Sequence, residues 1–204
     1  RDDHYTIREY IRNFIMSKLE TNQVDPSTGT TLTLGTSGDT IAIPSGVTIA
    51  NSGTATGFGA NTPAFRASSA SSQTMSNNTV TKAVFGTEDF DTNSDFASSR
   101  FTPTVAGTYF VFTQLNIGNN SAADVVEYGH AQIFKNTTSI AKNIVDQKNS
   151  APSNQVACYC GTLVAMNGSS DYLEVFGQSA ATSGTAQISS GSNQTWFGAY
   201  KIIT

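Results

Sequence analysis

The chain has 204 residues, of which 38% are apolar and only 13% are charged, with a formal net charge of −4 and an isoelectric point near 5.0. The charged fraction is about half of the ~25% that is usual in soluble domains. Serine, threonine, asparagine and glycine take its place, which is typical of hydroxyl-rich all-β proteins outside cells or in virus particles. The eleven Lys and Arg residues are scattered, which argues against nucleic-acid binding, because phosphate contacts need clustered cations.

Membrane insertion and secretion are not expected either. No apolar run approaches the ~18 residues of a membrane-spanning helix. The first residues, Arg-Asp-Asp-His, begin no hydrophobic stretch of the kind that a secretory signal contains. We therefore expect assembly in a cytoplasm, with exposure outside the cell only after lysis.

Residues 1–20 predict an amphipathic helix. Eight charged residues fall in this stretch, and the apolar side chains of Ile7, Ile11, Phe14 and Ile15 recur at steps of three and four residues. An isolated helix of this length is marginal in water, and nothing downstream predicts a second helix that would cover its apolar stripe. We expect this segment to be a foot that docks onto sister chains or into another protein.

Residues 21–62 predict a shaft of short strands. Apolar and small polar residues alternate over 31–34, 40–43 and 47–49, and glycine-containing turns separate these runs. Three strands this short do not form a stable sheet alone, but three chains wrapped around one axis could bury their apolar side chains. The alternative interpretation is a disordered linker rich in Gly, Thr and Ser.

Residues 63–204 predict a compact antiparallel head of jelly-roll type. On one strand, Phe110 and Phe112 face one way while Tyr109 and Val111 face the other. One face can pack the sandwich, and the other is then an apolar surface that fits another subunit. The expected strands are 63–68, 79–85, 107–117, 125–135, 139–146, 154–166, 170–178 and 195–203.

The head resembles C1q/TNF-like domains. Two runs carry the resemblance, Phe85–Asp91 and Asp95–Phe112, and the closing run Trp196–Ile203 is similar to the family's last strand. Pro103 stands one place earlier than in many members. The matching positions are Phe90, Asp91, Phe101, Thr102, Gly107, Tyr109 and Phe112. The resemblance implies a ten-stranded jelly roll assembled as a compact homotrimer.

The segment 32–49 resembles the short β repeats that precede such heads in tailed-phage structural proteins, marine and cyanobacterial phages above all. The chain as a whole is therefore similar to a bacteriophage fibre with a helical foot, a β shaft and a trimeric head. By this analogy residues 1–20 attach to a tail or capsid protein of the virion. Three functions fit: a tail fibre that recognises a host surface polysaccharide, a capsid decoration without specific binding, and a secreted C1q-like recognition module.

Enzyme chemistry is not expected. The two histidines, His4 and His130, stand apart, and no nucleophile elbow, zinc-protease motif or phosphate-binding loop is present. Cys158 and Cys160 alternate on a predicted strand, where we expect two small buried side chains rather than a disulfide or a metal site.

The acidic stretch 88–95 leaves two interpretations open. Asp89, Asp91, Asn93 and Asp95 alternate with other residues as in the first half of a calcium loop, but Ser94 and Arg100 stand where an EF-hand needs Gly and Glu. One interpretation is a looser Ca²⁺ site, the only cofactor considered. The other is a solvated acidic turn, with Asp91 capping backbone amides and Arg100 as an ion partner.

The predicted recognition surface is a set of long polar loops at the tip of the head. Alternate connections of an antiparallel fold lie at the same end, which places 69–78, 118–124, 147–153 and 179–194 together, away from the shaft. Binding residues concentrate in such loops, and side-chain amides suit hydrogen bonds to a host glycan. The alternative interpretation is solvent-exposed loops without a binding role. The candidate residues are Asn119, Asn120, Gln147, Lys148, Asn149, Gln187 and Asn193.

Overall fold

The computed structural model describes residues 23–53, 61–120, 126–148, 153–181 and 184–202. The chain divides into two compact units, residues 1–55 and 56–204, which are treated separately below. Strands and turns make up the described residues, and none of them forms a helix that could cross a membrane. The predicted helical foot of residues 1–20, with Ile7, Ile11, Phe14 and Ile15, lies outside these ranges and stays a prediction.

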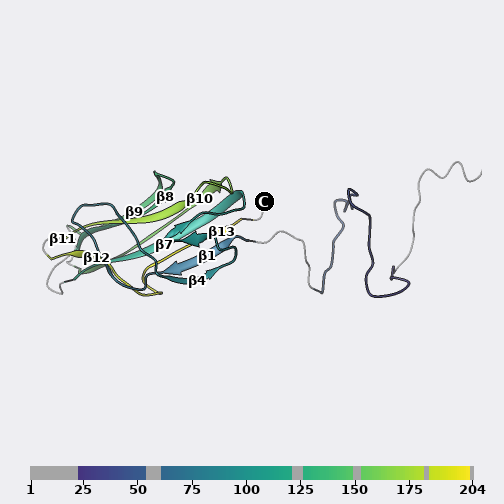
Figure 1. Ribbon diagram of the computed structural model, residues 1–204, viewed down its shortest axis with the longest axis horizontal. Coiled ribbons are helices and arrows are strands. Elements are labelled where there is room, and N and C mark those ends of the chain that lie inside the picture. The colour runs from purple at the N-terminus through teal and green to yellow at the C-terminus, as the bar shows by residue number, and fades with distance from the viewer. Residues whose placement is uncertain (1–22, 54–60, 121–125, 149–152, 182–183, 203–204) are drawn as a thin grey trace, which may run out of the picture. The chain divides into compact units, whose positions relative to one another are not determined.

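The second unit is a sandwich of two antiparallel sheets (Figure 1). In sheet A, the long strand β7 pairs on one edge with β10 and on the other with β13 and then β12, while β1 and β4 follow outside β13 and β2 outside β12. Its strands are β1 (Ala64–Ser68), β2 (Gln73–Thr74), β4 (Thr87–Asp91), β7 (Gly107–Asn119), β10 (Gln155–Met166), β12 (Ala186–Ile188) and β13 (Trp196–Lys201).

Sheet B covers the inner face of sheet A. Its main order is β5-β6-β11-β8-β9, and the short β3 pairs with β11 beside β6. The bounds are β3 (Thr81–Lys82), β5 (Phe96–Ala97), β6 (Arg100–Phe101), β8 (Val126–Lys135), β9 (Thr138–Asp146) and β11 (Leu173–Ala181). The predicted all-β, jelly-roll class is confirmed.

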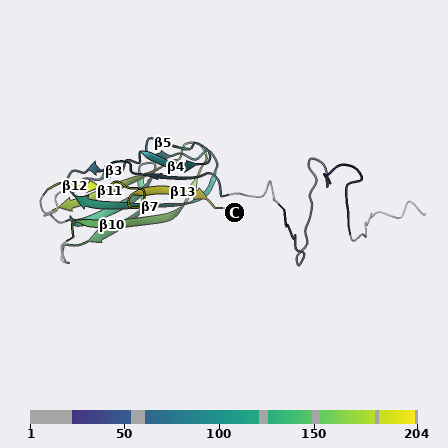
Figure 2. The same ribbon diagram turned by 90° about the horizontal axis from the view of Figure 1, so that it is seen from below.

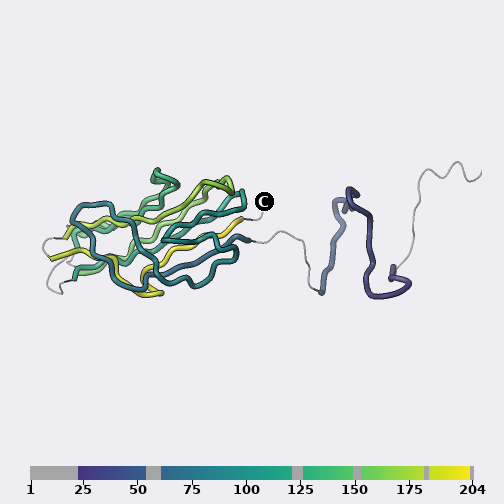
Figure 3. Tube along the Cα trace, in the orientation of Figure 1, coloured from purple at the N-terminus to yellow at the C-terminus, as the bar shows by residue number. Residues whose placement is uncertain are grey.

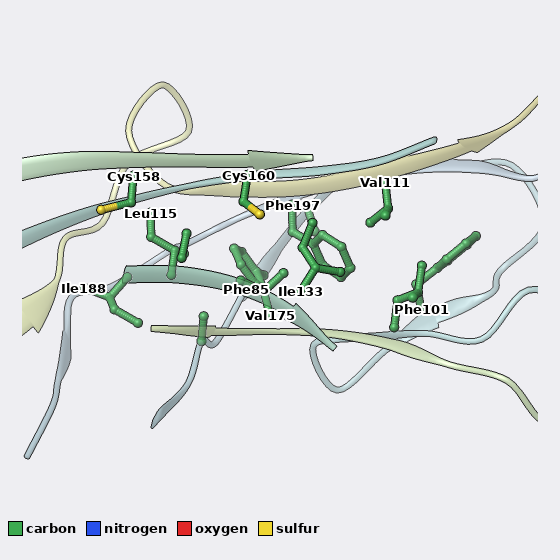
Figure 4. Close-up of a cluster of buried hydrophobic side chains, with 14 of the residues drawn as sticks. Phe85, Phe101, Val111, Leu115, Ile133, Cys158, Cys160, Val175, Ile188 and Phe197 are labelled. Carbon is green, nitrogen blue, oxygen red and sulfur yellow. The ribbon is translucent and has the colours of Figure 1, made fainter. Parts of the chain in front are cut away.

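The core lies between the two sheets and is rich in aromatic rings. Phe65 stacks on Phe101 with ring centroids 4.3 Å apart and meets Phe197 edge-on at 4.9 Å. Aromatic pairs at such separations stabilise a core beyond the area that they bury. Cys158 and Cys160 point from β10 into this layer (Figure 4), and burial raises the pKa of the Cys158 thiol to about 11. The two cysteines are thus the small buried side chains that their spacing predicts.

One glycine marks where the sheets pack most closely. A Cβ on Gly129 of β8 would lie 2.4 Å from Val156 Cγ2 and 3.0 Å from Cys158 Sγ of β10. Real Cβ atoms do not approach other atoms so closely. Strand β8 can therefore pack this close to β10 only with glycine at position 129.

The head has two distinct ends, called here the base and the tip. At the base, the first and last strands of the head lie side by side, since Ala64 pairs with Tyr200 and Lys201 N–H donates to Pro63 O. Figures 1 and 2 show this end beside the C mark, with β12 at the far end. Figure 3 shows the yellow C-terminal segment returning to the place where the head begins.

The predicted strands correspond well to the long strands, and the short ones were missed. Seven of the eight expected ranges overlap long strands, whereas 79–85 contains only the two-residue β3. No strand was expected at β4, whose sequence Thr-Glu-Asp-Phe-Asp holds three carboxylates and is mostly exposed. Acidic residues are uncommon in strands, so this edge strand depends on its pairing with β1.

Residues 23–53 form turns rather than strands in the single chain. Two four-residue turns close with Asp39 N–H donating to Thr36 O (3.0 Å) and Val47 N–H donating to Pro44 O (3.2 Å). Each places a glycine in the left-handed region at its third position, with φ of 96° at Gly38 and 85° at Gly46.

These turns belong to a repeat. Residues 27–34, 36–43 and 44–51 each have glycine third, threonine fifth and leucine or isoleucine sixth. Gly29 also adopts a left-handed φ of 76°. The apolar side chains that follow the turns are exposed, at 62% for Leu34 and 63% for Ile49. The intertwined three-chain shaft therefore stays a prediction, and these side chains have no cover within the described part of one chain.

Candidate interaction surfaces

The outer face of sheet A exposes a continuous group of apolar rings. On β7, Tyr109 and Val111 are fully buried, while Phe110 and Phe112 turn outward and are only half-buried, as the alternation predicts. Neighbouring strands extend the group, since the ring of Tyr200 lies 5.7 Å from Phe110. We call this surface the aromatic face. It consists of Phe110 and Phe112 of β7, Tyr159 and Leu163 of β10, and Trp196 and Tyr200 of β13.

Two glycines leave room for the phenylalanine rings of the aromatic face. Gly198 pairs with Phe112 across β13 and β7, and a Cβ there would lie 2.9 Å from the Phe112 ring. Gly161 pairs with Phe112 on the other side, and its Cβ would lie 3.4 Å from Phe110 Cζ. The surface is apolar, and Leu163 and Tyr159 are 61% and 49% exposed on it.

The edge of the aromatic face is polar. The Arg66 guanidinium lies 5.9 Å from the centroid of the Trp196 ring and forms an ion pair with Asp89. A charged rim around an apolar centre is the usual composition of a protein–protein interface.

Backbone hydrogen bonds bring the predicted tip loops together. Asn119 N–H donates to Asn154 O at 3.0 Å, and Asn120 N–H donates to Thr185 O at 3.1 Å. The fourth loop joins them where Asn77 Oδ1 accepts from Ala181 N–H. Connections that follow β1, β7, β9 and β11 therefore meet at one end, opposite the base.

The candidate tip residues differ in their exposure to solvent. Asn120 and Lys148 are exposed, whereas Asn119 is buried at the end of β7. Gln147 Oε1 is buried and has no hydrogen-bond partner among the described residues. Asn149 lies outside the described residues.

Two candidates lie outside the loops that the sequence predicts. Gln187 belongs to β12 at the tip end of sheet A, where it pairs with Gly118 and Thr74. Asn193 lies in the connection 189–195, which runs along the middle of β7 because Asn116 N–H donates to Thr195 Oγ1. The stretch 179–194 looked like one polar loop because the three-residue β12 has no clear hydrophobic alternation.

The acidic stretch does not form one cluster. Asp89 pairs with Arg66, Asp91 accepts from Asn93 N–H and Phe96 N–H, and the buried Asp95 accepts from Thr104 N–H. In the described parts of the chain, no group of three or more His, Cys, Asp or Glu side chains is arranged to hold a metal ion. The geometry favours the acidic-turn interpretation, with Asp91 capping backbone amides as expected.

Arg100 does not pair with the acidic turn, which corrects the expected ion partner. Its Nε donates instead to Glu174 Oε1 at 2.9 Å, and Lys82 Nζ donates to the same oxygen at 2.7 Å. Burial alone would raise the pKa of Glu174, but the hydrogen bonds from Lys82 and Arg100 outweigh it and hold the pKa below its usual value. The Glu174 side chain is only 7% exposed, so its charge depends on these two cations.

A polar cavity of about 560 Å³ lies beside this ion cluster. Lys82, Arg100 and Asp95 line it, together with the hydroxyl-bearing residues Ser94, Ser98, Thr102 and Thr104. We call it the serine cavity. Sequence reasoning missed it, because nothing in the sequence shows that residues 94–104 fold around a hollow beside Lys82.

His130 is a structural residue of β8. Its ring packs on Tyr128 with centroids 4.7 Å apart, and its partners across the sheet are Gln178 and Ile144. Burial and the nearby Lys142 lower its pKa, so the neutral imidazole is favoured. His4 lies outside the described residues.

Comparison with solved structures identifies the fold. A crystal structure of murine APRIL at pH 5.0 matches with a TM-score of 0.50 and 11% identity, covering 68% of this chain and 98% of that one. A second, at pH 8.0, gives the same TM-score and coverage at 10% identity. The head is a C1q/TNF-like jelly roll. The globular domain of zebrafish complement 1qA protein also matches, at TM-score 0.49 and 12% identity over 69% of this chain and 98% of that chain.

At these identities the comparison establishes the fold alone. No protein-family model and no curated protein sequence matches this chain. The C1q/TNF-like resemblance that the runs Phe85–Asp91 and Asp95–Phe112 indicate is therefore supported by the structure of the head rather than by sequence similarity.

Proposed function

We propose that this chain is a homotrimeric recognition module whose heads associate through the aromatic face. The observation that carries the proposal is this face itself. It places six large apolar side chains side by side on the solvent side of a sheet whose other side already packs the core. Contiguous apolar surface of this kind marks an interaction site.

The second copy of the chain is the partner that the molecule favours. Apolar side chains also stay uncovered in the repeat 27–51, so both units of the chain have surface that association with further copies would bury. The C1q/TNF-like fold supports three as the number of copies, since that resemblance implies a compact homotrimer. Obligate interfaces are large and hydrophobic, as this one would be.

We assign the tip to ligand contact and the chain's N-terminal part to attachment. The head begins and ends at the base, so the tip is the end of the head opposite the point where the chain enters it. The finer assignment is a phage tail fibre, in which residues 1–20 bind a tail or capsid protein and the tip binds a host surface polysaccharide. It is supported by the resemblance of 32–49 to phage shaft repeats and by the amide-rich tip.

Substitution at the tip tests the recognition role. Gln147→Ala/Lys148→Ala removes an amide and a cation from the connection after β9. We expect adsorption to host cells to fall by about tenfold, the value of one or two lost polar contacts. The melting temperature should stay unchanged within about 2 °C, because Lys148 is exposed and Gln147 Oε1 has no hydrogen bond among the described residues to lose.

The matched control is Lys142→Ala, which removes an exposed lysine from the middle of β9 rather than from the tip. It should leave adsorption unchanged. Full adsorption by the tip variant, or an equal loss in the control, would show that the tip is not the binding surface. Imaging the protein on an intact particle would separate the fibre from a capsid decoration or a secreted module.

A further inference from the structure

The serine cavity has features of a ligand site. Ser94 and Ser98 line it with left-handed backbone, at φ of 57° and 52°. Glycine adopts this conformation without strain, whereas it costs other L-residues conformational energy. The hydroxyls of Ser94 and Ser98 make no hydrogen bond within the described residues. Each serine therefore presents an unused hydroxyl at a position where the backbone alone favours glycine.

A third serine, Ser99, has a structural role. Ser99 is also left-handed, with φ of 58°, and together with Ser98 forms the tight two-residue turn between β5 and β6. Its hydroxyl accepts from the buried Phe85 N–H at 2.9 Å and thus satisfies a backbone donor. Ser99 does not line the cavity. The hydroxyls of Ser94 and Ser98 are exposed instead and are open to groups outside the chain.

The cations of the cavity are held in place by the protein. The Arg100 guanidinium carbon lies 3.9 Å from the centroid of the Tyr172 ring, and its Nε donates to Glu174. The two Nη groups have no acceptor in the described part of the chain. Lys82 Nζ donates to Glu174 and to Ser98 O at 3.1 Å, which leaves one of its three donors. A fixed guanidinium edge is suited to a carboxylate, which it can bind through two parallel hydrogen bonds.

The remaining groups favour a polyhydroxyl ligand with a single charge. Glu174 and Asp95 together balance the charges of Lys82 and Arg100, so a ligand carboxylate would be bound through the unused Nη donors of Arg100 rather than through an excess of positive charge. Asp95 Oδ2 accepts from Thr104 N–H at 3.2 Å, and its other oxygen can accept from a ligand hydroxyl. The Asp95 carboxylate would repel a doubly charged phosphate more strongly than a singly charged carboxylate. A volume of about 560 Å³ is within the usual range for small-molecule sites.

We propose that the serine cavity binds a uronic acid residue of an acidic polysaccharide. The sugar carboxylate lies against Arg100 and Lys82, and the ring hydroxyls bond with Asp95 and with the hydroxyls of Ser94 and Ser98. The inference deepens the proposed recognition function by naming a ligand class, and it places a site on the sheet B side of the head, apart from the tip. Assembly through the aromatic face of sheet A does not require this cavity to be covered.

A matched pair of sugars tests the ligand class. Isothermal titration calorimetry of the full chain uses the tetramer of β-1,4-linked mannuronate and, as its neutral counterpart, β-1,4-mannotetraose. We expect the acidic tetramer to bind at least about tenfold more tightly, because a charge-assisted pair is lost in the neutral sugar. Equal binding of both, or no binding of the acidic tetramer at millimolar concentration, overturns the proposal.

Serine-to-glycine variants test the location. Ser94→Gly/Ser98→Gly removes both hydroxyls but suits the left-handed backbone, so it should weaken mannuronate binding by about tenfold while the melting temperature does not fall. Arg100→Lys keeps a cation beside Glu174 but not the two parallel donors, and it should weaken binding similarly. Ser99→Gly is the matched control: it should lower stability, since Phe85 N–H loses its acceptor, and leave binding unchanged.

The tip variant separates this proposal from the proposed function. Gln147→Ala/Lys148→Ala should bind mannuronate as the parent does. If the tip variant loses the sugar while Ser94→Gly/Ser98→Gly keeps it, acidic sugars bind at the tip, and the cavity proposal is wrong although recognition stands. If the cavity variants lose the sugar and cells are still adsorbed normally, the cavity binds uronate but is not the receptor site.

Discussion

Leu163 offers the sharpest test of assembly through the aromatic face. It lies on β10 opposite Phe110 and is 61% exposed in the single chain. Burying a whole leucine side chain contributes about 1.5–3 kcal/mol, so covering three-fifths of it contributes about 1–2 kcal/mol. Three copies in a trimer give about 3–6 kcal/mol, which corresponds to two to four orders of magnitude in the dissociation constant. Leu163→Ala should remove most of this contribution.

Sedimentation equilibrium across a range of protein concentrations measures the effect directly. The matched control is Ile144→Ala on β9 of sheet B, because Ile144 is 53% exposed but lies outside the aromatic face. We expect Leu163→Ala to shift the protein towards folded monomer and Ile144→Ala to behave as the parent. Unaltered assembly of the Leu163 variant, or equal dissociation of both variants, would refute the assignment of this face to the interface.

Two further predictions concern the interior of the head. Glu174→Gln should destabilise the fold at neutral pH by about 1–3 kcal/mol. The pKa of Glu174 is lowered in the folded state, so the difference in unfolding free energy between parent and variant is complete above the usual glutamate pKa and disappears as the pH falls through the lowered pKa. Urea titrations from pH 7 to pH 3 should show the two unfolding free energies becoming equal. A difference that stays constant with pH would contradict the ion cluster. Gly129→Ala should cost about 1–3 kcal/mol by overpacking against Val156 and Cys158, whereas Gly53→Ala, whose Cβ meets only Asn51 Oδ1 at 3.8 Å, should leave the unfolding free energy unchanged.

Periodicity predicted the long strands because a half-buried strand repeats every two residues. Tyr109 to Phe112 alternate so regularly that both the core face and the outer face follow from the sequence alone. The short strands could not be predicted in this way, since β12 has three residues and β4 is acidic and exposed. Their conformation is fixed by hydrogen bonds to distant partners, namely β7 for β12 and β1 for β4.

The candidate surfaces were predictable only where local pattern decides position. The alternating directions of antiparallel strands predicted correctly that the tip loops lie at one end. Asn193 was placed wrongly, because the sequence does not show that strand β12 precedes it. The ion cluster was out of reach for another reason. Glu174 lies 92 residues from Lys82 and 74 from Arg100, and nothing in a single sequence shows which distant cation a buried carboxylate will meet.

The entry of the chain at the base has a mechanical consequence. If the tip is held by a ligand and the chain is pulled through the residues before Pro63, the load enters the head along β1. This strand is hydrogen-bonded on both sides, to β13 and to β4, and bonds between strands run perpendicular to the strand axis. A pull along that axis loads all of these bonds together in shear instead of opening them one at a time. The head is thus attached through a strand, β1, whose hydrogen bonds resist a pull along the strand axis.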